Sequence, residues 1–200
     1  MCGIFGIVTN QVITFLYLAT KLGGQDSSSL MAIPTWMEAT LEAVEPQVAA
    51  IETFIAKWHD FYILGYGLTY PMALEGALKL KEITYAHCEG MLSTEFKHGP
   101  LSAVTDDYPV IFVAGPEDIP LIVSGINEVT CRGARAIVIG LDDPRLQANA
   151  HNLISLPAKQ AEIFSLMSIL PLHLLSYRLS IGLGYDPDFP RNLSKTLTVD

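Results

Sequence analysis

The chain has 200 residues, of which 50% are apolar and only 16% charged, and its net charge is −9. Its 12 basic residues face 21 acidic ones and form no cluster of more than two neighbours, which argues against nucleic acid as the main partner. This length suits one domain, or one and a fraction. An apolar content this high favours a parallel sheet buried on both faces or a large subunit interface.

The first residues, MCGIFGIV, place a cysteine directly after the initiator methionine. Once Met1 is removed, Cys2 carries a free α-amine beside its thiol. That amine can act as the general base for the thiol, as in N-terminal nucleophile hydrolases. The same residues also fit a short apolar strand with two glycines, so the stretch alone leaves both interpretations open.

The cysteine and histidine patterns give no sign of a metal or a disulfide. Cys2, Cys88 and Cys131 are an odd number without disulfide or metal-ligand spacing, which favours a reducing cytoplasm. We expect Cys88 and Cys131 to be buried, small apolar groups rather than reactive thiols. The histidines show no ligand spacing, and there is no P-loop or GxGxxG pattern, so we expect neither a metal nor a cofactor.

Helices are predicted in the first part of the chain. The polar start and apolar spacing of residues 9–22 predict a first helix, which GGQDSSS then ends. A second helical pattern begins at about Pro34 and continues to Trp58. We expect Pro46 to divide this second pattern into two helices.

From residue 60 onward, short apolar runs alternate with helical patterns. Continuous Val/Ile runs of this kind are typical of a parallel sheet covered on both faces. The prediction is therefore a doubly wound α/β domain over about residues 60–184, preceded by helices. In chain order its predicted elements are a strand at 61–67, a helix at 70–87, a strand at 108–115, a helix at 117–133, strands at 134–141 and 151–158, and a long helix from Gln160.

That last helix is the most apolar part of the chain. Its pattern, residues 161–184, is interrupted by Glu162, Pro171, His173 and Arg178. These interruptions favour a buried core helix over a membrane span.

Charged side chains gather on one predicted helix face. Glu75, Lys79 and Glu82 are spaced by four and three residues and therefore share a face. Such a stripe is either a set of solvated ion pairs or part of a site. The helix follows a glycine turn at the carboxyl end of a strand, where α/β domains place ligands. Downstream, His98 is followed by Gly and Pro, as in a positioned loop, so the combination favours a site.

Three stretches of the chain are similar to one enzyme family. ALEGALKLKEITYAHCEGMLSTEFKHGPL resembles the second sugar-isomerase (SIS) half of the glutamine–fructose-6-phosphate aminotransferases, or glucosamine-6-phosphate synthases. PRNLSKTLTVD resembles the carboxyl-terminal tail of that family, and MCGIFGIV resembles its amino terminus. The resemblance implies an SIS-type doubly wound α/β domain of about five parallel strands, two of which make a full isomerase unit.

The resemblance also implies roles for four residues. Glu82 corresponds to the base that moves a proton between adjacent carbons of the open-chain sugar. Lys79 corresponds to a residue that stabilises the negative charge developing beside it. His98 corresponds to a residue that helps to open the sugar ring and reaches into a neighbouring subunit's site. Lys195 corresponds to the tail lysine that forms a Schiff base with the ketone of fructose 6-phosphate.

The phosphate contacts are less well defined by the resemblance. In the family a Ser/Thr-rich loop of the first SIS half holds the phosphate through backbone N–H groups. The DSSS stretch, residues 26–29, follows a helical pattern and is not predicted to be that loop. The turn residues Gly65, Gly67 and Thr69, with Glu75 beside them, are the expected substrate contacts in this chain.

The similarity to the glutaminase half stops near Val8. The residues that recognise glutamine and stabilise the oxyanion have no counterpart, so Cys2 is predicted to be non-functional. The implied organisation is a glutaminase-type remnant at 1–8, helices like the end of a first SIS half at 9–58, an SIS domain at 59–184 and an active-site tail at 185–200.

Three interpretations of function follow and remain open. The first is an enzyme that converts fructose 6-phosphate toward glucosamine 6-phosphate in hexosamine synthesis. The second is a non-catalytic module that binds a sugar phosphate or dimerises, as a homodimer or with a full-length homologue. The third is a fragment with no independent function. The first two take a sugar phosphate as partner and involve neither nucleic acid nor membrane.

Overall fold

A computed structural model describes residues 28–157 and 161–193. The chain divides into two compact units, Met1–Ala39 and Thr40–Asp200, and each is described by itself. Cys2 and Lys195 lie outside the described residues, as does the helix predicted at 9–22.

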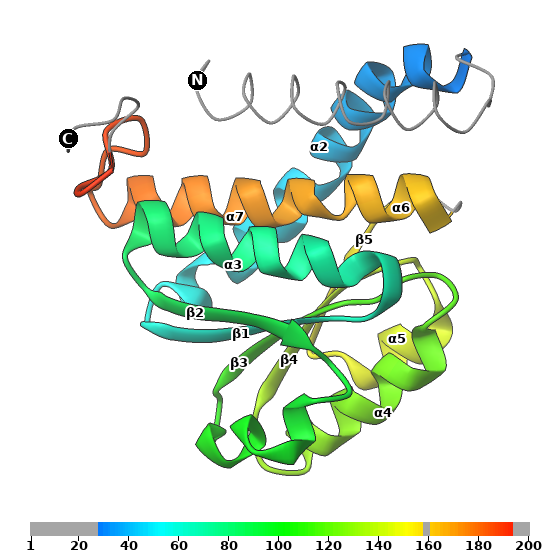
Figure 1. Ribbon diagram of the computed structural model, residues 1–200, viewed down its shortest axis with the longest axis vertical. Coiled ribbons are helices and arrows are strands. Elements are labelled where there is room, and N and C mark those ends of the chain that lie inside the picture. The colour runs from blue at the N-terminus through cyan, green and yellow to red at the C-terminus, as the bar shows by residue number, and fades with distance from the viewer. Residues whose placement is uncertain (1–27, 158–160, 194–200) are drawn as a thin grey trace, which may run out of the picture. The chain divides into compact units, whose positions relative to one another are not determined.

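A five-stranded sheet, all parallel, forms the centre of the second unit (Figure 1). Its strand order, β2-β1-β3-β4-β5, reverses direction at β1, as in doubly wound folds. The predicted α/β fold class is therefore confirmed. The strands are β1 Asp60–Gly65, β2 His87–Leu92, β3 Pro109–Val113, β4 Arg135–Gly140 and β5 Asn152–Ser155.

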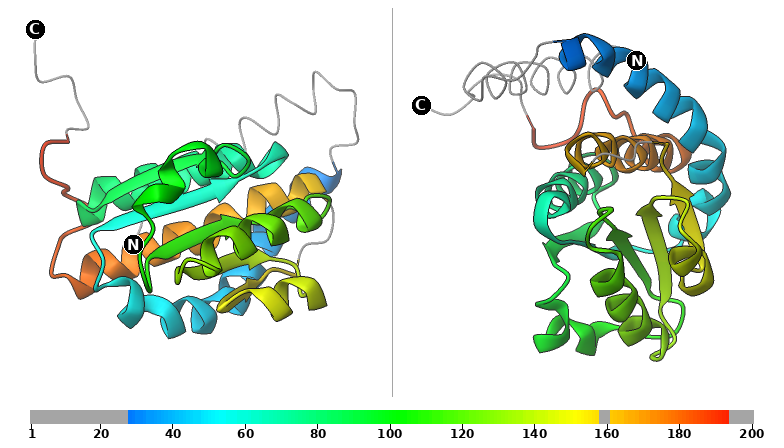
Figure 2. Two further views of the ribbon diagram at one scale, coloured as in Figure 1. Left: turned by 90° about the horizontal axis from the view of Figure 1, so that it is seen from below. Right: turned by 90° about the vertical axis from the view of Figure 1, so that its right-hand side faces the viewer.

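Helices cover both faces of this sheet (Figure 2). Helices α3 and α7 pack together on one face, and α4, α5, η2 and η3 lie on the other, where their apolar side chains share one buried cluster with β3 and β4. The helices are α2 Ser28–Ile55, η1 Gly67–Thr69, α3 Tyr70–Thr84, η2 Phe96–His98, η3 Pro100–Ala103, α4 Ile119–Thr130, α5 Pro144–Asn149, α6 Ala161–Met167 and α7 Ile169–Gly182.

Two prolines act differently from the prediction. Helix α2 continues through Pro46, because Val44 and Val48 on either side are fully buried and their burial offsets the lost hydrogen bond. The expected division at Pro46 is therefore wrong. The predicted helix from Gln160 is instead two helices, α6 and α7, separated at Ser168. Pro171 cannot donate to the carbonyl of Met167, the last residue of α6, which accounts for the interruption.

Strand β2 was not expected from the sequence. The helix predicted to reach His87 ends at Thr84, where Tyr85 takes a left-handed conformation with φ of 61°. The strand that follows, HCEGML, has no Val/Ile run and pairs only with β1 at the edge of the sheet. Gly90 is needed there because a Cβ would lie 2.8 Å from the carbonyl oxygen of Ala73 on α3.

The α3–α7 contact depends on Gly76. A Cβ at this position would meet the side chain of Leu172 on α7, whose Cβ and Cγ would both lie 3.1 Å away. We therefore expect Gly76→Ala to lower the free energy of unfolding by about 1–3 kcal/mol, as overpacked cores do. Gly182→Ala is the matched control on α7, since its Cβ would make an ordinary contact of 3.4 Å with Glu52. Equal urea midpoints for both variants would contradict this expectation.

The apolar stretch Ile163–Gly182 is long and apolar enough to cross a membrane, but 72% of it is buried inside the fold. This burial agrees with the predicted core helix, because the core helices of soluble domains can be as long and as apolar as a membrane span. Cys88 is buried as expected, and burial raises the pKa of its thiol to about 12. The expectation for Cys131 is wrong: it caps α4 outside the buried face of that helix and is exposed.

Candidate functional site

The charged stripe predicted from the sequence lies on α3 and is joined by ion pairs. The Nζ of Lys79 is 2.7 Å from Oε2 of Glu82 and 3.6 Å from Oε1 of Glu75. The side chains of Lys79 and Glu82 are only 21% and 27% exposed. Partial burial weakens the competition from water, so this pair is stronger than a fully solvated one.

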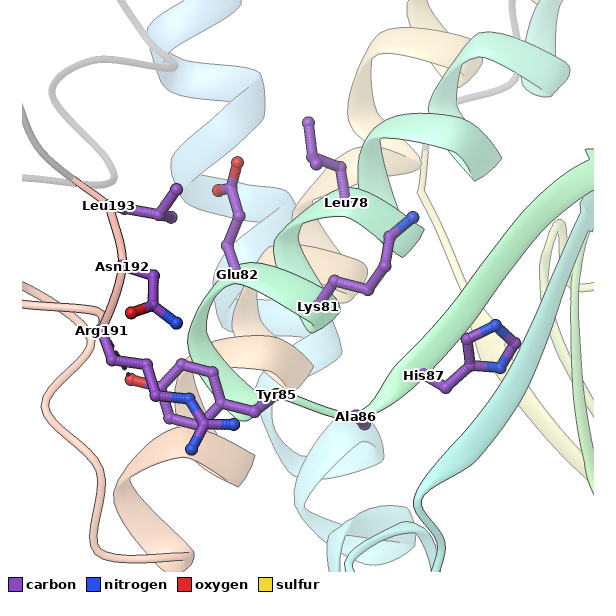
Figure 3. Close-up of a pocket in the computed structure, with 9 residues that line it drawn as sticks. All are labelled: Leu78, Lys81, Glu82, Tyr85, Ala86, His87, Arg191, Asn192 and Leu193. Atoms are coloured by element: carbon purple, nitrogen blue, oxygen red, sulfur yellow. Dashed lines mark hydrogen bonds between the residues drawn. The ribbon is translucent and has the colours of Figure 1, made fainter. Parts of the chain in front are cut away.

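Glu82 borders an open pocket of about 590 Å³ at the C-terminal end of α3 (Figure 3). Glu82 lines this pocket together with Asn192 and Leu193, while the side chains of Lys81, Arg191 and His87 do not converge on one point (Figure 3). The pocket therefore places the Glu82 carboxylate beside the apolar side chains of Leu78 and Leu193. Its basic side chains are not gathered in the way that binding a phosphate requires. Its lining residues are Leu78, Lys81, Glu82, Tyr85, Ala86, His87, Arg191, Asn192 and Leu193.

Tyr85 anchors the C-terminal segment against this pocket. Its hydroxyl accepts a hydrogen bond of 2.9 Å from the backbone N–H of Arg191, whose guanidinium lies 4.0 Å above the Tyr85 ring. The ring of Tyr185 packs 4.8 Å away. These contacts bring Leu193 to the wall of the pocket that contains Glu82. Tyr85 also has a positive φ, which is uncommon for residues other than glycine and is often found at functional sites. Only the structure shows this conformation, because no sequence pattern predicted it.

The glycine turn after β1 is a tight structural turn. A Cβ on Gly65 would lie 2.6 Å from the carbonyl oxygen of Thr69, and Gly67 has φ of +52°. The hydroxyl of Thr69 accepts from the N–H of Tyr66 and lies 2.8 Å from the carbonyl oxygen of Val113, and Thr69 is only 1% exposed.

An acidic side chain occupies the same turn. The nearest heavy atom to a Cβ on Gly67 is a carboxylate oxygen of Asp118, at 3.5 Å. Burial, and the charge of Glu117, raise the pKa of Asp118. A carboxyl group at this turn opposes the binding of a phosphate, so the geometry favours a structural role for Gly65, Gly67 and Thr69.

His98 and Glu82 lie on opposite faces of the sheet. His98 ends η2 and is exposed, and its neighbour Phe96 packs edge-on against Tyr62, with ring centroids 4.8 Å apart. Phe96 belongs to the buried cluster shared with α4, whereas Glu82 is on α3. Because the sheet separates the two residues, one chain cannot bring both to the same small substrate.

His173 on α7 is the residue that sequence reasoning missed. Its side chain is 2% exposed, and its Nε2 is 3.9 Å from Oε1 of Glu75. This nitrogen is buried without a hydrogen-bond partner in the described part of the chain. Burial, and then the charge of Lys79, lower the pKa of His173 to about 4. The imidazole of His173 is therefore neutral at pH 7. It lies on α7, next to the charged stripe of α3.

Within residues 28–157 and 161–193, no group of three His, Cys, Asp or Glu side chains could hold a metal ion. The charged stripe of α3 brings together two carboxylates and an ammonium group, and α7 adds a neutral imidazole.

The sheet order and the helices on both faces define a doubly wound α/β domain with its charged site on the first covering helix. The chain belongs to the SIS domain family, whose model matches residues 54–182. Among curated proteins, the glutamine–fructose-6-phosphate aminotransferase (isomerizing) of Methanothermobacter thermautotrophicus is 38% identical over 196 residues. The same enzyme of Pyrococcus horikoshii is 36% identical over 200 residues. Each match covers 96% of this chain and 33% of the relative, so the chain spans about a third of the length of these curated relatives.

Solved structures give the same fold. The C-terminal domain of glucosamine-fructose-6-phosphate aminotransferase from Francisella tularensis superimposes with a TM-score of 0.72 at 30% identity, over 82% of this chain and 46% of that one. Glucosamine-6-phosphate deaminase from Thermotoga maritima superimposes with a TM-score of 0.74 over 92% of this chain and 54% of that one, at 21% identity. The second likeness concerns the fold alone.

Proposed function

We propose that this chain supplies part of a sugar-phosphate isomerase site, which converts fructose 6-phosphate toward glucosamine 6-phosphate in hexosamine synthesis. The observation that carries the proposal is the half-buried Lys79–Glu82 pair, 2.7 Å apart, at the edge of the open pocket that Leu193 helps to line. The names of the curated relatives support the choice of substrate.

Glu82 is the proposed base. Its carboxylate removes a proton from C1 of the open-chain C2 imine, the C1–H electrons form a C1–C2 double bond, and the C2=N electrons move to nitrogen, which takes a proton. Return of a proton to C2 with loss of the C1 hydroxyl proton then gives the aldehyde at C1 and the amine at C2. Lys79 stabilises the negative charge that develops on the substrate during this transfer. Lys79 already lies 2.7 Å from Glu82, so a substrate that approaches Glu82 also approaches a positive charge.

Lys195 is the proposed source of the imine. Its neutral amine attacks the C2 ketone, and loss of water gives the Schiff base. Ammonia then adds to C2 and displaces the Lys195 amine, which leaves the C2 imine on which Glu82 acts. Lys195 is outside the described residues, but it follows Leu193 by two positions, and two residues of chain span at most about 7 Å. The contacts of Tyr85 with Arg191 therefore support the delivery of this tail to the Glu82 pocket.

His98 is proposed to act from a second copy of the chain. The sheet lies between His98 and Glu82 in one chain, so ring opening by His98 requires a homodimer, or association with a full-length homologue.

We further propose the predicted organisation, with an SIS domain at 59–184 and a tail at 185–200. We also propose that the protein works in a reducing cytoplasm, which the free thiols of Cys88 and Cys131 suit.

A second candidate function is a non-catalytic module that binds a sugar phosphate or dimerises. The observation that favours it is that the sheet separates His98 from Glu82, so that one chain by itself lacks a complete set of the proposed catalytic groups.

Ligand binding tests the shared part of both candidates. Fructose 6-phosphate at a hundred times its dissociation constant stabilises a binding protein by about 2.7 kcal/mol. For 200 residues we therefore expect the thermal midpoint to rise by roughly 5–10 °C, with glutamine as the control that gives no shift. A folded protein that shows no shift with fructose 6-phosphate or glucosamine 6-phosphate would contradict the proposal.

A further inference from the structure

His173 has an unusual position for a core residue. It lies on α7 beneath the charged stripe of α3, with its side chain 2% exposed and Nε2 without a partner among the described residues. A buried polar atom left unpaired lowers the stability of the folded state, so an apolar side chain at this position would be more stable. Packing alone therefore does not explain why a histidine occupies this position.

One carboxylate oxygen of the charged stripe on α3 lies near both Lys79 and His173. Oε1 of Glu75 lies 3.6 Å from Nζ of Lys79 and 3.9 Å from Nε2 of His173. Both gaps exceed the distance of a good hydrogen bond, whereas Lys79 is 2.7 Å from Glu82. Glu75 is therefore held loosely between two possible partners. Its side chain is 39% exposed, which leaves it room to move the further 1 Å that a hydrogen bond to His173 needs.

We propose that His173 is a positioning residue for the Glu82 site: its Nε2–H binds the Glu75 carboxylate and so draws Glu75 away from Lys79. Without this donor, Glu75 and Glu82 compete for one ammonium group. With it, Glu75 has its own partner, and Lys79 serves only Glu82 and the charge that forms on the substrate when Glu82 moves the proton. This inference rests on the proposed function in its account of catalysis, but the contact between His173 and Glu75 is testable without it.

Among the described residues, two charged side chains face His173. They are Glu75 and Lys79, both on α3. Burial and the charge of Lys79 keep the imidazole neutral, with a pKa of about 4, so it has one N–H to place. The inference requires that this proton be on Nε2. If it is on Nδ1, then Nε2 is an acceptor and repels the carboxylate.

Nitrogen NMR of the ¹⁵N-histidine-labelled full chain decides the tautomer. We expect the His173 resonance to be that of an Nε2–H tautomer, and we expect it to shift in Glu75→Gln but not in Glu128→Gln, the same change on α4. An Nδ1–H tautomer, or a resonance unaffected by Glu75→Gln, would overturn the inference whether or not the chain is active.

Kinetics with fructose 6-phosphate and ammonia separate positioning from packing. His173→Gln keeps an N–H donor on an unbranched side chain, whereas His173→Met fills a similar volume without one. We expect His173→Met to lower kcat about 10-fold or more with KM unchanged and an undiminished thermal midpoint, and His173→Gln to recover most of kcat. Equal kcat in the two variants would overturn the inference. Absence of turnover in the unsubstituted chain would instead count against the proposed function, and the NMR result would then decide the role of His173.

Discussion

Replacing Glu82 with Gln is expected to lower the isomerisation rate by 10²- to 10⁴-fold while the protein stays folded. The amide keeps the size of the side chain but cannot accept the substrate proton, and general-base catalysis contributes a factor of this order. The change also removes the ion pair with Lys79, which is 2.7 Å long and partly exposed. Pairs of this kind contribute at most about 1 kcal/mol, so the thermal midpoint should change little.

The measurement is the rate of glucosamine 6-phosphate formation from fructose 6-phosphate and ammonia. Glu128→Gln is the matched control, because it makes the same chemical change on α4, which packs on the opposite face of the sheet from α3. If Glu82→Gln and Glu128→Gln retain the same rate as the unsubstituted chain, Glu82 is not the base.

Acid should destabilise the protein through His173. The folded pKa of about 4 is lower than the ordinary value of 6.5, because burial, and then Lys79, disfavour the imidazolium. The unfolded chain therefore binds more protons between pH 6.5 and pH 4, and stability falls as the pH falls through that window. The shift corresponds to about 3 kcal/mol of unfolding free energy, present in full above pH 6.5 and lost below pH 4.

Urea unfolding at several pH values measures this slope. His173→Gln should flatten the loss of stability between pH 6.5 and pH 4, because the variant has no imidazole to protonate in the unfolded state. His59→Gln is the control, since His59 is exposed and its side chain has no ion pair among the described residues, whereas His87 pairs with Asp60. An undiminished slope in His173→Gln would show that other groups cause the acid sensitivity.

The sequence predicted the elements whose patterns are strong. Four of the strands are Val/Ile runs or alternations that a parallel sheet buries, and each was expected. Strand β2 was missed because its residues, HCEGML, carry no such run and the strand forms by pairing with β1 at the sheet edge. The continuity of α2 through Pro46 was missed for a related reason, since burial of Val44 and Val48 outweighs the local effect of proline.

The candidate site was predicted in part. Spacing by four and three placed Glu75, Lys79 and Glu82 on one helix face, and the ion pairs confirm that they share it. The site argument relied on the carboxyl end of β1, whereas Glu82 lies two residues before the C-terminal end of α3. His173 could not be assigned, because only the packing of α7 against α3 brings it to Glu75.

The central claim, that the Glu82 pocket moves a proton between adjacent sugar carbons, is tested most directly by isotope exchange. Fructose 6-phosphate and ammonia are incubated with the full chain in D₂O, and NMR follows deuterium at C1 of the ketose and at C2 of the aldose product. The account predicts incorporation by the unsubstituted chain and none by Glu82→Gln. A folded protein whose thermal midpoint responds to fructose 6-phosphate, but which incorporates no deuterium, would contradict the catalytic claim and favour the non-catalytic binding module.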